Sequence, residues 1–182
     1  MSQRSLIITG ATGMVGGHAL QLCLDAPEVG RVTTLGRRAT GLEHPKLREV
    51  EHGDFLDLAP VTDALAGHDA CLFCLGVYTG AVPDDEFRRI TYDYTRSFAE
   101  ALHAGSSEAA FCFLSGQGAD PTEKSRMAFA RHKGAAEKAL DAAGFPRLHI
   151  FRPGYIYPVE KRQEPNFTYR LSRGVWPVLR RV

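Results

Sequence analysis

The sequence predicts an α/β domain built on a doubly wound parallel sheet. Strand-like and helix-like segments alternate from the first residues, the strand-like segments are almost continuously apolar, and a glycine-rich turn joins the first strand to the first helix. Helices bury both faces of a parallel sheet, so its strands read as apolar runs. With 182 residues the chain has the size of one domain.

Each element follows from local pattern. Short runs rich in β-branched and apolar residues predict six strands, at 5–9, 31–35, 47–51, 69–75, 109–114 and 147–151. Helix-like segments between them are expected at 13–26, 60–66, 84–104 and 124–143. After Pro153 prolines interrupt the pattern. We therefore expect one domain over 1–182, with 154–182 as a small or truncated substrate-side lobe.

Composition excludes several classes of partner. The formal net charge of +1 provides no field for gathering nucleic acid or coating a membrane. No apolar run reaches the roughly 18 residues of a membrane helix, and the N-terminus has no signal-peptide pattern. These features predict a cytoplasmic protein.

Two of the four cysteines form a Cys-x-x-Cys pair, Cys71 and Cys74, inside an apolar run. Residues three apart on a strand point to opposite faces, so the two thiols are expected to diverge. No second Cys or His pair stands at zinc-site spacing. We therefore expect buried core thiols, no metal site and a reducing compartment.

The first strand runs into Thr-Gly-Ala-Thr-Gly-Met-Val-Gly at 9–16. A strand, a glycine turn and a helix N-terminus together bind a pyrophosphate, because the backbone approaches it closely and unpaired N–H groups favour its charge. This context predicts a Rossmann-type dinucleotide site. The expected pyrophosphate contacts are Gly10, Thr12, Gly13, Met14 and Val15.

The end of the second strand indicates which nucleotide binds. An NAD site usually carries an acid there for the ribose 2′-hydroxyl. This chain has Leu35-Gly36-Arg37-Arg38 instead. Guanidinium groups suit a 2′-phosphate. The sequence therefore favours NADP(H), with Arg37 and Arg38 as its ligands and NAD(H) as the alternative.

Two further strand ends offer contacts along the same edge. Asp54 and Phe55 follow the third strand and are expected at the adenine, through an acid side chain and a backbone amide. Leu75 and Gly76 end the fourth strand and are expected along the ribose on the nicotinamide side. Ligands of such sheets bind along this carboxyl edge.

Beyond these sites, the chain resembles the extended or atypical branch of the short-chain dehydrogenase/reductase superfamily. It is most similar to the Tat-interacting-protein-like and epimerase/dehydratase-like members. The matching segments cover nearly the whole chain in the expected order and lie at 9–16, 35–38, 67–69, 74–76, 114–115, 118–120, 133–134 and 151–154. The resemblance implies a Rossmann-type NAD(P)-binding fold and an oxidoreductase-like protein.

The resemblance also implies catalytic positions. In that superfamily a Ser at the end of the fifth strand orients a carbonyl, and a Tyr-x-x-x-Lys on the next helix supplies the acid and a ribose ligand. Ser115 and Lys133 match the Ser and the Lys, but Phe129 stands at the tyrosine position. Pro153 and Gly154 match the turn that meets the nicotinamide carboxamide.

Three interpretations remain open. The chain binds NADP(H) without turnover and acts through a protein partner. Alternatively it is an active reductase or nucleotide-sugar-epimerase-like enzyme whose proton comes from another group, the candidates being His132, Tyr155, Tyr157 and Tyr78. In the third, a carbonyl substrate is reduced slowly with help from water and positioning alone. A homodimer through the helices after the fourth and fifth strands is also expected from the resemblance.

Overall fold

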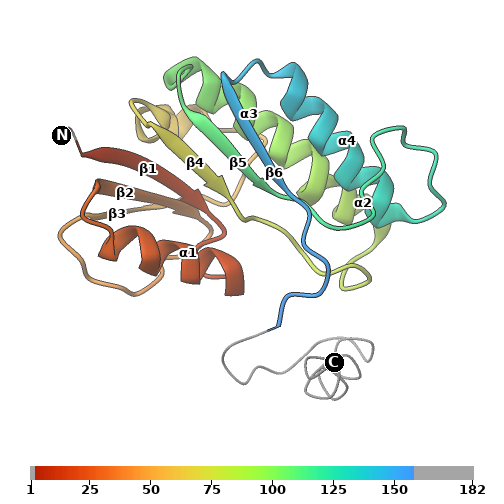
Figure 1. Ribbon diagram of the computed structural model, residues 1–182, viewed down its shortest axis with the longest axis horizontal. Helices are drawn as coiled ribbons and strands as arrows, with labels where there is room; N and C mark the ends of the chain where they lie inside the picture. Colours follow the sequence, from red (N-terminus) through yellow and green to blue (C-terminus); the bar gives the residue numbers. More distant parts are fainter. Residues whose placement is uncertain (1–2, 158–182) are drawn as a thin grey trace.

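The computed structural model describes residues 3–157. Within that range, six parallel strands form one sheet in the order β3-β2-β1-β4-β5-β6 (Figure 1). The strands are β1 Arg4–Thr9, β2 Val29–Gly36, β3 Leu47–Glu51, β4 Ala70–Phe73, β5 Ala110–Leu114 and β6 Arg147–Phe151. The strand order reverses between β1 and β4, and a crevice forms at such a switch point. The predicted doubly wound sheet is confirmed.

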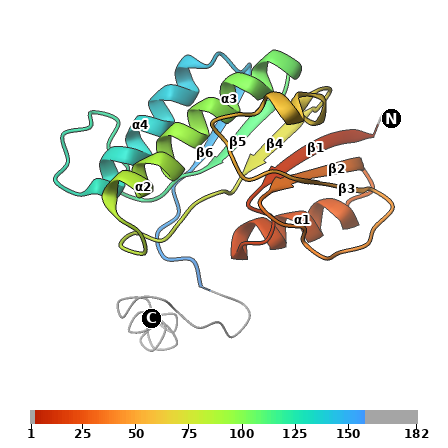
Figure 2. The same ribbon diagram turned by 180° about the vertical axis from the view of Figure 1, so that it is seen from behind.

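Helices cover the two faces unequally (Figures 1 and 2). Helix α1, Met14–Asp25, lies on one face, in contact with β1, β2 and β4. The opposite face carries α2, Asp84–Arg88, α3, Tyr94–Gly105, and α4, Ala128–Ala142, with the short 3-10 helix η1, Ala59–Leu65, packed beside α3. None of the helices in this part of the chain is long and apolar enough to cross a membrane.

Two apolar cores lie on either side of the sheet. Alternate strand residues face opposite sides, so Ile7 joins the larger core and Ile8 the smaller one under α1. The larger core, facing α3 and α4, is filled by phenylalanines, and Phe73 contacts Phe98, Phe111 and Phe113 with ring centroids 5.3–6.0 Å apart. The packing of these rings holds β4 and β5 together and against α3.

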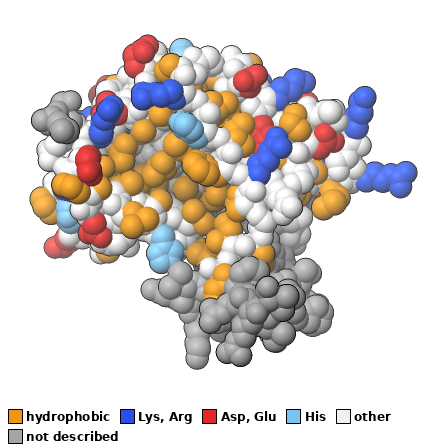
Figure 3. All heavy atoms as spheres, in the orientation of Figure 1, with side chains coloured by type: hydrophobic (Ala, Val, Ile, Leu, Met, Phe, Trp, Pro, Cys, Tyr) orange, Lys and Arg blue, Asp and Glu red, His pale blue; other side chains and the backbone are white. Residues whose placement is uncertain are grey.

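On the α1 side, no helix among residues 3–157 covers the sheet over β5 and β6, and apolar side chains gather there (Figure 3). Phe151 at the end of β6 is 57% exposed. Cys74 and Cys112 are half-buried and lie on this face, whereas Cys71 is fully buried in the larger core. The prediction that Cys71 and Cys74 diverge is confirmed. The prediction that both thiols lie in the core is confirmed for Cys71 and wrong for Cys74, which lines a groove on the α1 side of the sheet.

Two helices differ from their predicted bounds. The helix expected at 84–104 is continuous but contains a π turn, η2, over Arg89–Asp93. The helix expected from 124 begins only at Ala128. The carboxylate of Asp120 accepts hydrogen bonds from the backbone N–H groups of Thr122 and Ser125, which keeps the preceding residues in a turn. Of the expected substrate-side segment 154–182, the part beyond Tyr157 lies outside the described residues.

Candidate nucleotide-binding site

The glycine turn lies at the switch point between β1 and β4. Gly10 has a φ of +71°, and a Cβ there would lie 2.6 Å from the carbonyl oxygen of Cys74. The N–H of Gly13 donates a hydrogen bond to the Gly10 carbonyl at 2.9 Å, and a Cβ on Gly16 would overlap that same carbonyl. The turn can pass between β4 and α1 only because these positions lack side chains.

The N-terminus of α1 is open to an anion. Gly13 is the N-cap, no side chain caps the helix, and its first turn contains no acidic residue. The first N–H groups of a helix lack intrahelical partners, and the helix dipole favours negative charge beside them. Thr12 is exposed, and Met14 and Val15 are half-buried. The five predicted pyrophosphate contacts therefore surround one unpaired helix end.

Arg37 and Arg38 are both exposed directly after β2. A Cβ on Gly53 would lie 3.5 Å from Cγ of Arg37, so the arginine stem runs beside the turn that follows β3. Asp54 in that turn is exposed, and its Oδ1 accepts a hydrogen bond from the backbone N–H of Leu56. The structure thus brings the predicted 2′-phosphate and adenine residues together.

Phe55 differs from its neighbours in this turn. Its ring is 1% exposed and stacks on Tyr94 in the larger core, with centroids 5.6 Å apart. Phe55 can therefore contribute to a nucleotide site only through its backbone.

Across the switch point, the amine of Lys133 reaches the end of β5. Its Nζ donates a hydrogen bond to the carbonyl oxygen of Leu114 at 2.8 Å and lies 4.7 Å from the ring centroid of Phe113. Burial lowers the pKa of the Lys133 amine from 10.5 to about 8, against the opposing influence of Glu137 and Cys74. The lysine is thus a buried amine held at the carbonyl of the residue that precedes Ser115.

Ser115 is buried, and its hydroxyl is already engaged. Its Oγ donates a hydrogen bond to Oε1 of Glu137 at 2.5 Å. Arg152 pairs with both oxygens of that carboxylate through Nε and Nη2. Sequence reasoning missed Glu137 and Arg152. The available signals were the spacing of Glu137, four residues after Lys133 and so on the same helix face, and the position of Arg152 directly after β6.

Phe129 lies one helical turn before Lys133, and the tip of its ring rests against the backbone of Gly116, where an added Cβ would overlap it. His132 faces away, toward α2: its Nε2 lies 3.0 Å from Oδ1 of Asp84, and its ring contacts Phe87. His132 is therefore poorly placed to replace a missing tyrosine.

The three tyrosines considered as alternative acids lie on other elements. Tyr78 is half-buried in the segment after β4. The rings of Tyr155 and Tyr157 contact each other after β6, with centroids 6.4 Å apart. None of the three stands on α4, the helix that carries Lys133.

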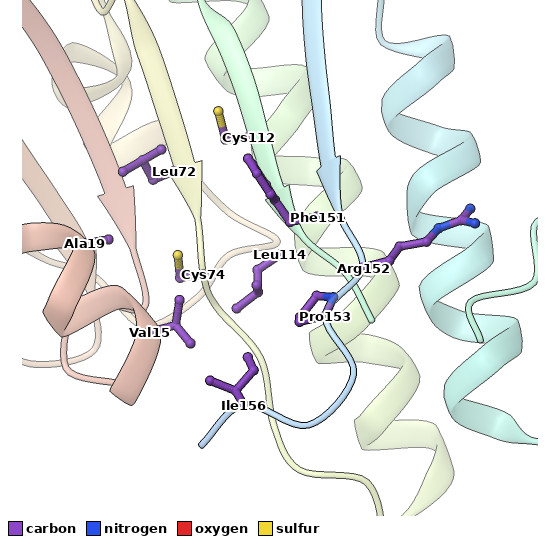
Figure 4. A pocket seen from close by; sticks show the side chains of 10 residues that line it. All are labelled: Val15, Ala19, Leu72, Cys74, Cys112, Leu114, Phe151, Arg152, Pro153 and Ile156. Carbon is purple, nitrogen blue, oxygen red and sulfur yellow. The ribbon is translucent and has the colours of Figure 1, made fainter. Parts of the chain in front are cut away.

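An apolar groove of about 540 Å³ continues from the glycine turn across the ends of β4, β5 and β6 (Figure 4). Its lining residues are Val15, Ala19, Leu72, Cys74, Cys112, Leu114, Phe151, Arg152, Pro153 and Ile156. Gly76 is exposed, with open space where a Cβ would stand, and Leu75 packs partly against the larger core. Burial raises the pKa of the Cys74 thiol to about 11, which keeps this thiol uncharged at neutral pH.

Gly154 lies against the side chain of Gln117, since a Cβ added there would lie 2.8 Å from Oε1 of Gln117. Residues 3–157 contain no group of three or more His, Cys, Asp or Glu able to hold a metal ion. The arrangement offers an anion site, two arginines and a buried lysine along one sheet edge, which suits an elongated phosphorylated ligand.

Comparisons with known proteins identify this ligand class. Residues 10–172 match the family described as NAD(P)H-binding. The chain is 32% identical over 167 residues to the protein HTATIP2 of Rattus norvegicus, covering 91% of this chain and 68% of that protein. It is 29% identical to the mitochondrial protein fmp52 of Emericella nidulans, covering 88% of this chain and 70% of that protein.

Solved structures share the fold. The NAD⁺ complex of WbmH from Bordetella bronchiseptica matches with a TM-score of 0.72 at 22% identity, covering 94% of this chain and 63% of that one. The NAD complex of UDP-glucuronic acid 4-epimerase from Bacillus cereus matches with a TM-score of 0.72 at 17% identity, covering 95% and 64%. The chain thus spans about two thirds of the length of these proteins. It belongs to the NAD(P)H-binding family, as a homologue of HTATIP2 with a Rossmann-type fold.

Proposed function

We propose that this chain binds NADP(H) and that its hydride-transfer activity is weakened or absent. The observation that carries the proposal is Phe129, which occupies the position one helical turn before Lys133 where a tyrosine would supply the proton. A phenyl ring cannot act as a general acid, and such help is worth roughly 10²–10⁴-fold in rate. A protein with the binding edge but without the acid is suited to sensing or carrying the nucleotide.

The preference for NADP(H) rests on the end of β2. Arg37 and Arg38 are exposed there, and Arg37 runs beside the turn that contains Asp54. No acidic residue stands at 35–38 to hold a ribose 2′-hydroxyl or to repel a 2′-phosphate. Guanidinium groups form paired hydrogen bonds with phosphate oxygens.

Lys133 keeps a binding role in this proposal. Bound NADPH would supply a hydride, and the residues of this chain would place it. The Lys133 amine lies at the end of β5. From there it would hold the nicotinamide-side ribose, while Gly10, Gly13 and the first turn of α1 hold the pyrophosphate. Leu75, Gly76, Pro153 and Gly154 would line the remaining path.

A second candidate is an active NADPH-dependent reductase or an epimerase-like enzyme that uses another acid. Tyr155 and Tyr157 favour it, because they flank the groove residue Ile156 in the segment after β6. His132 does not, because Asp84 and Phe87 hold its ring toward α2.

The test is a calorimetric titration of the purified protein with NADPH and with NADH. We expect tighter binding of NADPH, and a loss of about tenfold or more in NADPH affinity for Arg37→Ala or Arg38→Ala with NADH affinity unchanged. Arg147→Ala is the matched control, because Arg147 begins β6 at the opposite edge of the sheet. Equal affinity for both nucleotides in the parent protein would contradict the NADP(H) preference.

Turnover is measured separately. We expect no NADPH oxidation above the uncatalysed rate with a panel of small aldehydes and ketones. Steady NADPH oxidation that Tyr155→Phe or Tyr157→Phe abolishes would instead support the reductase.

We also propose a cytoplasmic, reducing location and a protein partner or a second copy as the binding partner. The four cysteines are free in the structure, which suits a reducing compartment. The fmp52 relatives are named as mitochondrial proteins. Imaging of a fluorescent fusion tests the location, and mitochondrial fluorescence would overturn it.

A further inference from the structure

The hydroxyl of Ser115 can donate a single hydrogen bond, and the structure shows which group accepts it. Glu137 is 3% exposed and pairs with the guanidinium of Arg152, so its carboxylate can only accept hydrogen bonds. The 2.5 Å contact between Oγ of Ser115 and Oε1 of Glu137 is therefore a donation from the serine. A serine whose proton is committed in this way cannot also donate to a ligand carbonyl.

Burial supports the same conclusion. Ser115 is 7% exposed, and its backbone N–H donates to the carbonyl of Phe151 at 2.8 Å. Ser115, Glu137 and Arg152 thus connect β5, α4 and the residue after β6 through one network. Breaking such a network by removing one partner is costly, because it leaves a buried charged group less well satisfied.

Gln117, the next residue after Ser115 with a polar side chain, is exposed where Ser115 is buried. Gly116 has no side chain, and Gln117 is exposed. The backbone N–H of Gln117 donates to the carbonyl of Pro153 at 2.8 Å, which ties its loop to the turn after β6. Its side-chain amide lies against Gly154, and a glycine follows it at Gly118 with a φ of +89°. An amide can both donate and accept.

We propose that Ser115 is a structural residue held by Glu137 and Arg152, and that the side-chain amide of Gln117 hydrogen-bonds the nicotinamide group of the nucleotide. The second half of this inference rests on the proposed function. In the sheet order, Gln117 follows β5 and Arg37 follows β2, on opposite sides of the switch point. A dinucleotide that straddles this point places its two halves on these two sides.

The test uses the full chain, two ligands and one stability measurement. Binding of NADPH is compared with binding of 2′-phospho-ADP-ribose, which lacks the nicotinamide ring, and the melting temperature is recorded without ligand. For Gln117→Ala we expect NADPH binding to weaken about five- to tenfold. Binding of 2′-phospho-ADP-ribose should be unchanged and the melting temperature nearly so. Gln21→Ala, on the exposed face of α1, is the matched amide control.

For Ser115→Ala we expect the opposite pattern: a melting temperature lower by about 3–10 °C, with affinity for both ligands within about twofold of the parent. Ser107→Ala, at an exposed serine, is the control. Should Ser115→Ala fail to fold, that result supports the structural role, and Ser115→Cys then serves for the binding measurements.

Two results would overturn the inference. One is a Ser115→Ala protein that melts like the parent but loses NADPH selectively. The other is a Gln117→Ala protein that binds NADPH as tightly as the parent or loses both ligands equally. If the parent protein itself does not bind NADPH, the proposed function and the Gln117 assignment fail together, while the melting series still decides the role of Ser115.

Discussion

At the scale of single residues, Phe129 and Lys133 give the site its character. They stand one helical turn apart on α4, with the phenyl ring against Gly116 and the amine against the carbonyl of Leu114. The phenyl ring of Phe129 has no proton to donate, and burial lowers the pKa of the Lys133 amine. Both positions are visible in the sequence, but only the structure shows what each side chain touches.

A tyrosine placed at position 129 tests whether the rest of the site can still catalyse hydride transfer. For Phe129→Tyr we expect reduction of small aldehydes or ketones by NADPH to rise by about 10–100-fold over the parent, because a positioned phenol supplies the missing proton. Stopped-flow absorbance of NADPH measures it, with Phe129→Leu as the control. A tyrosine variant that binds NADPH normally yet stays inactive would show that more than the acid is missing.

The Lys133 amine predicts a pH dependence of stability. Its folded-state pKa of about 8 lies below the ordinary 10.5, so between these pH values the unfolded chain binds more protons than the folded one. The free energy of unfolding contributed by Lys133 therefore rises with pH across this window, by up to about 3 kcal/mol.

Urea unfolding of the parent protein and Lys133→Met at pH 8 and 10.5 measures this contribution. The difference between the two proteins isolates Lys133, because the cysteine thiols titrate in both. A difference that stays constant or falls with pH would contradict the assignment.

At the scale of elements, the glycine turn is the best-determined feature. Gly10 and Gly41 both have positive φ, +71° and +78°, but a Cβ at Gly41 meets nothing within 4 Å. Comparing the two positions separates backbone strain from lack of space.

For Gly41→Ala we expect a loss of about 1 kcal/mol in the free energy of unfolding, from the left-handed conformation alone. For Gly10→Ala we expect at least about 3 kcal/mol, because the methyl group also presses on the carbonyl of Cys74. Denaturant unfolding measures both. Equal losses would mean that the turn relaxes freely away from β4.

Helix bounds were less predictable than the turn. Amphipathic pattern indicated one helix over 84–104 and another from 124, but the first contains a π turn at Arg89–Asp93 and the second starts four residues later, at Ala128. The competing interaction at the second site is the Asp120 carboxylate, which holds the N–H groups of Thr122 and Ser125. Side-chain bonds of this kind compete with helix formation.

At the scale of the whole molecule, nucleotide binding should stabilise the folded chain. At a concentration of 100 times its Kd, NADPH adds about 2.7 kcal/mol to the free energy of unfolding. For a chain of 182 residues this corresponds to a rise in Tm of about 5–10 °C. Differential scanning fluorimetry with equal concentrations of NADPH and NADH measures it. A larger rise with NADH would reverse the predicted preference.

The face over β5 and β6 that no helix among residues 3–157 covers also belongs to this scale. The sequence predicted apolar strands there, and the strands formed, but their α1-side residues line an exposed groove instead of a core (Figures 3 and 4). The sequence pattern of a strand shows which side chains are apolar, but it does not show which part of the chain covers them.

The sequence by itself determined the parallel sheet, the glycine turn, the arginines after β2 and the absence of a tyrosine on α4. Each of these is local, since it depends on periodicity or on residue type at a fixed spacing. Tertiary structure decided that Phe55 enters the core, that His132 turns toward Asp84, and that Ser115 donates a hydrogen bond to Glu137, whose carboxylate pairs with Arg152. Those outcomes depend on partners between 15 and 48 residues away along the chain, which no local pattern specifies.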